Sequence, residues 1–340
     1  DEACDRVVAA LTGGAPRAGV LVGESGSGKT AVAHEVVHRL RHHPGGAWRV
    51  LRVSPAEILV GTRFIGEWET KVQELVETVR APRRVLLYVP NLHELSQVGT
   101  TSRTDHNAAG MLAPHLESGD VAILGESSPE AFRSGLGAQP SLRRLFRRID
   151  LEAKGPEETR RIAAAVCAEA GAACPDAVLD RVLDLAAFHL PSAVDPGRSV
   201  GLLRDVLERQ PDRAVPLATG DLFRTLSSTT GVPVEMLDDE RPLDLERVRA
   251  FFEARVRGQP EAVGAMVDLV ALIKAGLTDP GKPYGVHLFV GPTGVGKTEL
   301  ARALAERLFG DPARLRRFDM SEYATFDAFE RLIGTAGRPG

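Results

Sequence analysis

The sequence predicts an α/β fold in which a parallel sheet is flanked by helices. Two observations lead to this prediction. Short apolar runs alternate with amphipathic segments over residues 1–150, and a glycine-rich motif of eight residues occurs twice. The first copy is Gly23-Glu24-Ser25-Gly26-Ser27-Gly28-Lys29-Thr30, and the second is Gly291-Pro292-Thr293-Gly294-Val295-Gly296-Lys297-Thr298. Both have the spacing of a phosphate-binding loop.

Each motif contains the residue types that binding of a triphosphate with Mg²⁺ requires. Glycines let the backbone curl so that successive N–H groups converge on phosphate oxygens. Lys29 and Lys297 are expected to reach the outer phosphates, and Thr30 and Thr298 to ligate Mg²⁺. The predicted nucleotide-binding residues are Glu24, Ser25, Gly26, Ser27, Gly28, Lys29, Thr30 and Ala31 in the first loop, and Pro292, Thr293, Gly294, Val295, Gly296, Lys297, Thr298 and Glu299 in the second.

The secondary-structure pattern places both loops between a strand and a helix. Residues 287–290 are expected to form the strand before the second loop. Residues 67–80 predict a helix with one apolar face, and residues 156–230 predict helices throughout. The candidate strands of the first part are residues 19–22, 49–53, 85–89, 121–124 and 148–151.

Composition is typical of a globular protein, because 43% of the 340 residues are hydrophobic and 26% are charged. A net charge of −4 with 5% aromatic residues argues against a nucleic-acid partner. The three cysteines have no paired metal spacing, and no apolar run approaches the roughly 20 residues that span a bilayer. A cytoplasmic protein without a membrane partner is therefore expected.

Residues Arg63-Phe64-Ile65-Gly66-Glu67-Trp68-Glu69 resemble a segment of the Clp ATPases, a family of the AAA+ superfamily that includes ClpA and ClpB. The resemblance implies an AAA+ fold, ATP as the nucleotide, and assembly into a ring that is a hexamer in the family. It also implies that Arg63, Phe64, Ile65 and Gly66 form a pore loop in which Phe64 grips polypeptide substrates. The alternative is that Phe64 is a core aromatic residue ahead of a helix.

Further matches to the family assign candidate catalytic residues. Leu124-Gly125-Glu126-Ser127-Ser128 stands where the family has Ile-Gly-Ala-Thr-Thr, which makes Ser127 the candidate sensor of the γ-phosphate. Arg144 matches one of two paired arginine fingers, whereas Leu145 occupies the other position and Arg143 replaces a glutamate. Arg198 is a candidate second sensor, or alternatively a solvated helix cap. In the second module, Arg257 and Gly258 match a stretch that packs beside adenine.

The acidic motif (Walker B) departs from the family. A hydrophobic strand ending in Asp-Glu is expected before Leu92-His93, but Pro90 and Asn91 occupy those positions. Proline has no acceptor side chain, and asparagine is a poor proton acceptor. Loss of a catalytic base slows the chemical step by about 10²–10⁴-fold. The first module is therefore predicted to bind ATP and to hydrolyse it poorly.

The resemblance divides the chain into four parts. Residues 1–152 are the first α/β subdomain, 153–230 a small helical lid, 231–255 a linker, and 256–340 the beginning of a second module. Because AAA+ sheets place later strands between the first and second strands, the second module is not expected to build its own sheet. The chain begins without Met and ends on Pro339-Gly340, so we expect a piece trimmed at both ends.

The leading interpretation is an ATPase subunit of a ring that threads polypeptides through its pore, with room for a peptidase or adaptor partner. Residues 205–221 are too few for the coiled coil of ClpB-type disaggregases, which favours a ClpA-like unfoldase. A second interpretation is a non-hydrolysing scaffold or regulator whose first ring binds ATP. A helicase or small-molecule kinase is a third, and the extent of the family match disfavours it.

Overall fold

The computed structural model describes the chain except Asp1, residues 61–66, 81–83, 101–106, 211 and 278–281, and most of 324–340. It divides into two compact units. The first unit contains Asp1–Ile162 with Leu190–Val200, and the second contains Ala163–His189 with Gly201–Gly340. The four-part division expected from the sequence stays a prediction.

The first unit contains a five-stranded sheet in the order β2-β3-β4-β1-β5, in which all neighbouring strands are parallel. All five predicted strands are confirmed, and their ends differ from the prediction by three residues at most. The first two strands along the chain are separated by β3 and β4, as expected for an AAA+ sheet. The strands are β1 (Arg17–Val22), β2 (Arg49–Arg52), β3 (Val85–Val89), β4 (Ala122–Ser127) and β5 (Arg147–Asp150).

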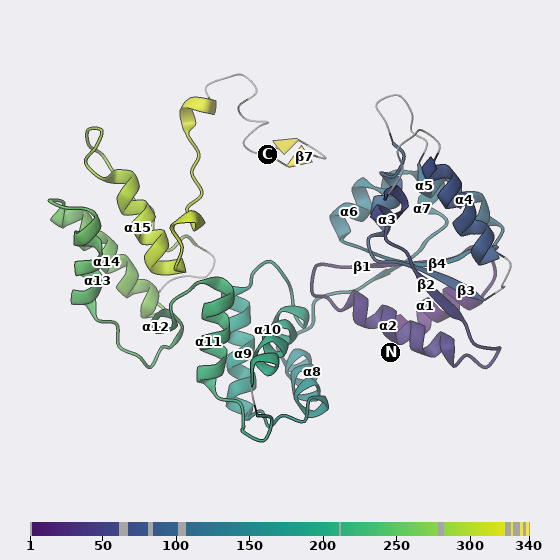
Figure 1. Ribbon diagram of the computed structural model, residues 1–340, viewed down its shortest axis with the longest axis horizontal. Coiled ribbons are helices and arrows are strands. Elements are labelled where there is room, and N and C mark those ends of the chain that lie inside the picture. Colours follow the sequence, from purple (N-terminus) through teal and green to yellow (C-terminus); the bar gives the residue numbers. More distant parts are fainter. Residues whose placement is uncertain are drawn as a thin grey trace. The chain divides into compact units, whose positions relative to one another are not determined.

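Helices cover both faces of this sheet (Figure 1). Helices α1 (Glu2–Thr12) and α2 (Lys29–Arg41) lie on one face, and α4 (Glu67–Arg80) and α5 (Ala108–Glu117) lie on the other. The predicted helix over residues 67–80 is confirmed with the same bounds. The shorter elements are α3 (Pro55–Leu59), η1 (Leu92–Ser96), α6 (Pro129–Ser134), η2 (Leu136–Ala138) and α7 (Pro140–Arg143).

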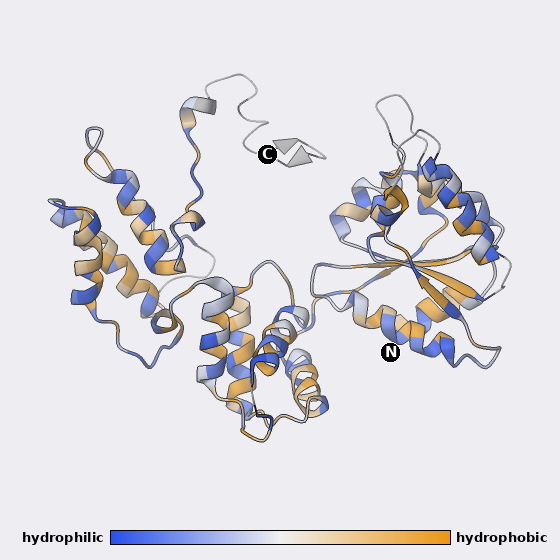
Figure 2. Ribbon diagram, in the orientation of Figure 1, coloured by the Kyte–Doolittle hydropathy of each residue, from blue (hydrophilic) through white to orange (hydrophobic). Residues whose placement is uncertain are grey.

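Alternate residues of the central strands point into two separate apolar cores. Leu87 of β3 packs with Val72 of α4, whereas its neighbour Leu86 packs with Val36 of α2. Because both faces of β1, β3 and β4 are buried, these strands are largely apolar, whereas the edge strands β2 and β5 carry exposed charged residues. Figure 2 shows hydrophobic strands between helices with one apolar side. The phosphate loop therefore begins at the end of a rigid, fully packed strand.

The region after the sheet is helical, as predicted. Helices α9 (Asp176–His189) and α11 (Thr219–Thr230) contact one another in the second unit. Helix α10 (Gly197–Arg209) and α11 are joined by residues 210–218, which leaves no long helical insertion between these two elements. Helix α8 (Pro156–Glu169) is the first of the four along the chain.

The C-terminal helices form a third apolar core. It lies between α13 (Leu245–Arg255), α14 (Pro260–Lys274) and α15 (Lys297–Phe309), and Phe252 and Met266 are fully buried in it. Helix α15 follows the second phosphate loop directly, as α2 follows the first. The remaining elements are α12 (Val234–Leu237), η3 (Pro312–Arg314), η4 (Met320–Tyr323), β6 (Gly334–Thr335) and β7 (Arg338–Pro339).

The strand predicted at residues 287–290 does not form, so that prediction is wrong for this chain. Leu288 and Val290 are 88% and 85% exposed, and none of the described strands pairs with this segment. A single extended segment cannot satisfy its backbone N–H and C=O groups without a neighbouring strand. The expectation that the second module does not build its own sheet stays a prediction.

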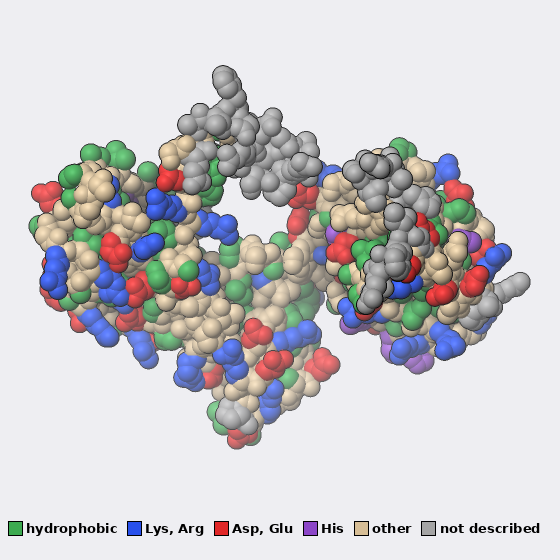
Figure 3. Space-filling model, turned by 45° about the horizontal axis from the view of Figure 1, so that its top comes forward, with side chains coloured by type: hydrophobic (Ala, Val, Ile, Leu, Met, Phe, Trp, Pro, Cys, Tyr) green, Lys and Arg blue, Asp and Glu red, His purple; other side chains and the backbone are tan. Residues whose placement is uncertain are grey.

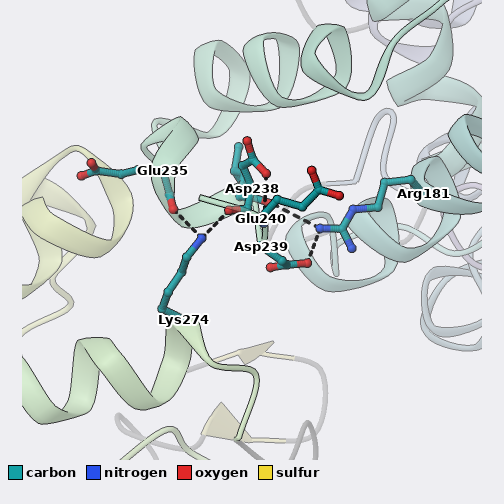
Figure 4. A network of polar contacts seen from close by, with 7 residues as sticks. Arg181, Glu235, Asp238, Asp239, Glu240 and Lys274 are labelled. Atoms are coloured by element: carbon teal, nitrogen blue, oxygen red, sulfur yellow. Dashed lines mark hydrogen bonds and ion pairs between the residues drawn. The ribbon is translucent and has the colours of Figure 1, made fainter. Parts of the chain in front are cut away.

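A polar network joins three elements of the second unit (Figure 4). Arg181 of α9 forms an ion pair with Asp239, which follows α12. Lys274 of α14 donates from Nζ to the carbonyl oxygens of Glu235 (2.7 Å) and Asp238 (2.5 Å). The side chains of Arg181 and Lys274 therefore approach the same turn from two helices.

His189, the last residue of α9, lies in the same region and is half-buried. The pKa of His189 is lowered to about 4, chiefly by burial and also by the positive charge of Arg181, while Asp239 opposes the shift. The folded chain therefore keeps this imidazole neutral at a pH where an unfolded histidine takes up a proton.

We predict that the second unit loses stability as the pH falls from about 6.5 towards about 4, because only the unfolded state binds the His189 proton in that window. After allowance for solvent screening, the free energy of unfolding should fall by about 2 kcal/mol over this pH range. Denaturant unfolding of the wild type and of His189→Gln at about pH 7 and about pH 4.5 would measure it. Equal pH dependence in the two proteins would contradict the prediction.

Candidate functional site: the two phosphate loops

The two phosphate loops have the same backbone conformation. In the first loop, Gly26 and Gly28 have φ values of 92° and 93°, and in the second, Gly294 and Gly296 have 88° and 100°. These values lie in the left-handed region, which side-chain-bearing residues rarely adopt. In each loop the second of these glycines is the N-cap of the helix that begins at the motif lysine. Both motifs therefore fold into the curled geometry that their spacing predicts.

The loop lysines make matching contacts. Lys29 donates from Nζ to the carbonyl oxygens of Gly23 (2.9 Å) and Glu24 (2.8 Å). Lys297 makes the same two bonds to the first two residues of its own loop, at 2.7 Å each. Burial lowers the pKa of Lys29, and the charges of Glu126 and Glu24 oppose that shift. Each ammonium group is held beside its loop, from which it can reach a bound phosphate.

The interior of the first loop fits a phosphate group. The Ser27 side chain is 4% exposed, and its hydroxyl has no hydrogen-bond partner among the described residues. A Cβ atom at Gly28 would meet no atom within 4 Å, so the backbone is open on that side. A buried hydroxyl without a partner and an open stretch of backbone beside a lysine are the features that an anion would complete.

Ser127 lies beside the start of the first loop. It is buried at the end of β4, next to Val22 of β1, and its carbonyl accepts a bond from the Gly23 N–H at 3.2 Å. Its hydroxyl donates to the Ser128 carbonyl at 3.1 Å and lies 3.4 Å from Nδ1 of His93. The structure therefore places the candidate sensor next to the loop, while its sensing role stays a prediction.

Two residues that the sequence reasoning did not select complete this edge of the sheet. Glu126 of β4 is 5% exposed, and its Oε2 accepts a bond from the Thr30 hydroxyl at 3.0 Å. The Tyr88 hydroxyl of β3 donates to the other carboxylate oxygen. Burial raises the pKa of Tyr88, and the hydrogen bond to Glu126 raises it further. The available signal was the glutamate at 126, where the resembling family has alanine.

Pro90 and Asn91 offer no carboxylate where β3 ends. Pro90 follows the last strand residue and is half-buried, whereas the Asn91 side chain is exposed and makes no cap hydrogen bond to η1. The neighbouring Leu92 is fully buried and fixes the position of this turn. The end of β3 therefore carries no acidic side chain at either of the two positions.

The candidate arginine finger is on the surface. The Arg144 side chain is 68% exposed and forms an ion pair with Glu117 at 2.7 Å. Leu145 is buried in the core against α4 and α5, and Arg143 is exposed. Within this chain, Arg144 contacts a surface glutamate of α5, and its role as a finger stays a prediction.

A segment before α10 packs against the first loop. The Val194 N–H donates to the Ser25 carbonyl at 2.7 Å, and the Gly197 N–H donates to the Gly26 carbonyl at 2.9 Å. A Cβ atom at Gly197 would lie 2.4 Å from the Gly26 Cα atom, so the contact requires glycine at both positions. Sequence reasoning identified Arg198 in this segment as a candidate second sensor but did not predict this backbone contact.

Arg198 directly follows Gly197, which contacts the first loop, and its side chain is bound to Asp195. Its guanidinium bonds the Asp195 carboxylate through Nη2 (2.7 Å) and Nε (3.0 Å), and the side chain is 22% exposed. The Ser199 hydroxyl donates to the other oxygen of Asp195 at 2.6 Å. Both expected roles of Arg198, second sensor or helix cap, stay open in this arrangement.

The stretch around Arg257 and Gly258 lies beside the second loop. Val256 lies 3.0 Å from the Cβ position of Gly296, and Gly258 has a φ of 72°. A pocket of about 340 Å³ is lined by Glu253, Val256, Arg257, Gly258, Gln259, Pro260 and Val263. The assignment of Arg257 and Gly258 to the second nucleotide site stays a prediction.

The remaining expected features have different outcomes. The predicted pore loop, Arg63 to Gly66, lies outside the described residues. In the described part of the chain, no group of three His, Cys, Asp or Glu residues could hold a metal ion, and no helix is long and apolar enough to span a membrane. Acidic and basic side chains are interspersed on the face drawn in Figure 3.

Comparison with known families identifies AAA sequence in both modules. Residues 20–123 match the family described as "ATPase family associated with various cellular activities (AAA)". Residues 282–338 match the family described as "AAA domain (Cdc48 subfamily)". The two matches contain the first and the second phosphate loop respectively.

Two curated relatives are Clp proteins. "Chaperone protein ClpB" of Oceanobacillus iheyensis is 29% identical over 409 aligned positions, which cover 97% of this chain and 49% of the relative. "ATP-dependent Clp protease ATP-binding subunit ClpL" of Staphylococcus aureus (strain USA300) is 26% identical over 380 positions, which cover 93% of this chain and 54% of the relative. The chain therefore spans about half the length of these relatives.

Solved structures with the same fold include Hsp104. The closed state of Hsp104 with ATPyS and FITC casein matches 98% of this chain and 59% of its own, with a TM-score of 0.66 and 24% identity. The extended Saccharomyces cerevisiae Hsp104–casein complex matches with a TM-score of 0.64 and 24% identity, over 100% and 60% of the two chains. The five-stranded parallel sheet with its phosphate loop has the AAA+ fold. Over most of its length the chain is therefore similar to the Clp ATPases, with AAA-family sequence in both of its modules.

Proposed function

We propose that the chain is the nucleotide-binding part of a Clp-like ring ATPase that threads polypeptides, and that its first module binds Mg²⁺ and ATP but hydrolyses ATP poorly. The observation that supports this proposal best is the pair of phosphate loops with one geometry, each with its lysine held beside the loop backbone. The kinship to ClpB and ClpL supports the general function.

The residues of the first loop have separate roles in this proposal. The loop N–H groups and Lys29 hold the phosphates, and Thr30 provides the hydroxyl that ligates Mg²⁺. When bound, the ion neutralises phosphate charge. Ser127 and Arg198 would be the two sensors of the γ-phosphate. The bond between Gly23 and Ser127 and the contact between Gly26 and Gly197, which precedes Arg198, support this assignment.

Slow hydrolysis follows from the residues at the end of β3. Neither Pro90 nor Asn91 can accept a proton from an attacking water molecule. The nearby Glu94 lies in η1, three residues further along the chain. Loss of the general base lowers the rate of the chemical step by about 10²–10⁴-fold. Binding of the phosphates through the loop amides and Lys29 is unaffected.

Ring assembly and polypeptide threading are proposed from the relatives and from two surface features. Arg144 is exposed, as a finger that reaches into a neighbouring subunit must be. The short connection between α10 and α11 favours an unfoldase without a coiled-coil insertion. ClpL is the ATP-binding subunit of a Clp protease, and the Hsp104 structure is a complex with casein. We therefore propose a peptidase or adaptor, and polypeptide substrates, as the partner classes.

A second candidate function is a non-hydrolysing scaffold whose first ring uses ATP only to hold the assembly together. The absence of carboxylates at Pro90 and Asn91 favours it. Measuring nucleotide binding and phosphate release separately distinguishes the two functions. Turnover by the second loop, abolished by Lys297→Ala, supports the motor, whereas ATP-dependent assembly without turnover supports the scaffold.

We predict that Lys29→Ala weakens ATP binding to the first loop by about 10-fold or more, because a charge-assisted contact to phosphate is lost. The assay is titration of a fluorescent ATP analogue in a Lys297→Ala background, which isolates the first loop. Lys71→Ala on α4 removes a lysine elsewhere in the same unit and serves as the control. Unchanged affinity in the Lys29 variant would remove the site assignment.

Restoring both acidic residues should raise hydrolysis. Pro90→Asp with Asn91→Glu is expected to increase phosphate release from the first loop by about 10²-fold, since a proton acceptor returns to the end of β3. The matched control is Pro90→Ala with Asn91→Gln, which changes the same positions without adding charge. Equal turnover in both double variants would contradict the limiting role of this motif and would point instead to Leu145.

Phe64→Ala should abolish unfolding of a tagged substrate protein while nucleotide affinity is retained, because the aromatic side chain is proposed to grip polypeptide. Phe188→Ala, which truncates a half-exposed aromatic of α9, is the control. Thermal unfolding tests the alternative. A loss of stability that accounts for the lost activity would favour a core position for Phe64.

A further inference from the structure

Glu126 is a buried carboxylate beside the first phosphate loop, in a position where the resembling family has alanine. Pro90 occupies the position of the family's aspartate and has no carboxylate. We propose that Glu126 supplies the missing carboxylate and positions Mg²⁺ at Thr30 through the hydration shell of the ion. This inference rests on the proposed nucleotide binding of the first module. It makes Glu126 a positioning residue for Mg²⁺ and leaves the general base missing.

The sheet places Glu126 at the level of the lost aspartate. Val89 of β3 pairs with Gly125 of β4, and the same register continued by one residue puts Pro90 beside Glu126. Strand β4 lies between β3 and β1, and the loop follows β1. Compared with an aspartate at the end of β3, the carboxylate of Glu126 therefore lies one strand closer to the loop, at the same carboxyl-terminal edge of the sheet.

Two hydroxyl groups fix the direction of the carboxylate. Leu124, two residues earlier on β4, packs in the same core as Tyr88 and α2, so Glu126 leaves the sheet on the α2 side. Thr30, in the first turn of α2, donates to Oε2 at 3.0 Å, and the Tyr88 hydroxyl donates to Oε1. Glu126 thus contacts the threonine that the motif assigns to Mg²⁺.

The charge of this group is informative. A buried carboxylate is costly unless its charge is compensated, and the described contacts of Glu126 are two hydroxyls, with the Lys29 ammonium near enough to be influenced by it. A triphosphate on the loop would add negative charge to the same edge. The single positive charge of Lys29 cannot balance both the Glu126 carboxylate and the triphosphate. A divalent cation between these two groups would remove their repulsion.

The same geometry separates metal binding from hydrolysis. Both oxygens of Glu126 are engaged by hydroxyl donors from β3 and α2. The exposed Asn91 stands at the position that polarises water in the family, and Glu126 does not replace it. The first module is thereby expected to require Mg²⁺ for tight ATP binding even though it turns ATP over slowly.

The test is the effect of Mg²⁺ on ATP affinity, measured in a Lys297→Ala background with a fluorescent ATP analogue. The Mg²⁺ effect is the ratio of the dissociation constants in EDTA and in Mg²⁺. Glu126→Gln should lower this ratio by about 10-fold or more, because loss of an outer-shell partner weakens metal binding by about 10–100-fold. Affinity in EDTA should be unchanged or tighter, since a negative charge is gone. Glu130→Gln, an exposed glutamate on α6, is the control.

Electron paramagnetic resonance of Mn²⁺ with ATP provides a direct readout of the ion. Glu126→Gln should lower the fraction of Mn²⁺ bound, and Pro90→Asp added to Glu126→Gln should recover it by returning a carboxylate to the adjacent strand. Tyr88→Phe keeps the carboxylate and removes one of its holders, so a smaller loss is expected. It also provides a test if the Glu126 variant does not fold.

The outcome that would overturn the inference is an equal Mg²⁺ effect in the wild type and in Glu126→Gln while both bind ATP. Lys29→Ala in the same assay is the separate test of the proposed function. If Lys29→Ala loses affinity while Glu126→Gln keeps the Mg²⁺ effect, the proposed role of Glu126 is rejected and the nucleotide site is retained. Unchanged affinity in Lys29→Ala rejects the site itself.

Discussion

The parallel pairing of β1 with β4 is the constraint on which the first nucleotide site depends. It brings the carboxyl ends of both strands to one edge, so that the loop after Val22 begins beside Ser127 and Glu126. The hydrogen bond from the Gly23 N–H to the Ser127 carbonyl extends this pairing into the loop itself. Apolar cores on both faces hold the two strands in register, which gives the loop a rigid base.

Comparison of the two phosphate loops shows which features depend on local sequence and which depend on the sheet. The second loop has the same glycine conformations and the same lysine contacts as the first, although the residues before it form no strand. The curl is therefore a property of the glycine spacing and of the helix that starts at the lysine. The sheet contributes something else: polar side chains of neighbouring strands, Glu126 and Ser127, that lie beside the first loop.

Those neighbouring side chains make the first site differ from the corresponding site of the Clp ATPases that the chain resembles. Loss of the carboxylates at Pro90 and Asn91 would remove both metal positioning and water activation if nothing replaced them. Glu126, held by Thr30 and Tyr88, lies where it can replace the first function and not the second. Such a site would retain nucleotide and release phosphate rarely, which suits a module that stabilises an assembly while another module performs work.

The contact between residues 194–197 and the first loop is a second tertiary constraint on this site. Gly26 and Gly197 approach so closely that a Cβ atom on either would collide with backbone. The loop is therefore in direct main-chain contact with the segment that begins α10 and carries Arg198. The contact uses main-chain atoms, which explains why no side-chain pattern pointed to it.

The sequence by itself determined the five strands, the helix over residues 67–80, the helical region from 156 to 230 and both loop conformations. These features depend on apolar periodicity and glycine spacing, which act over a few residues. Only the tertiary structure decided that residues 287–290 stay unpaired, because a strand exists only with a neighbour. It also decided that Thr30 meets Glu126 across 96 residues of chain, since strand order and register bring them together and neither can be read from local pattern.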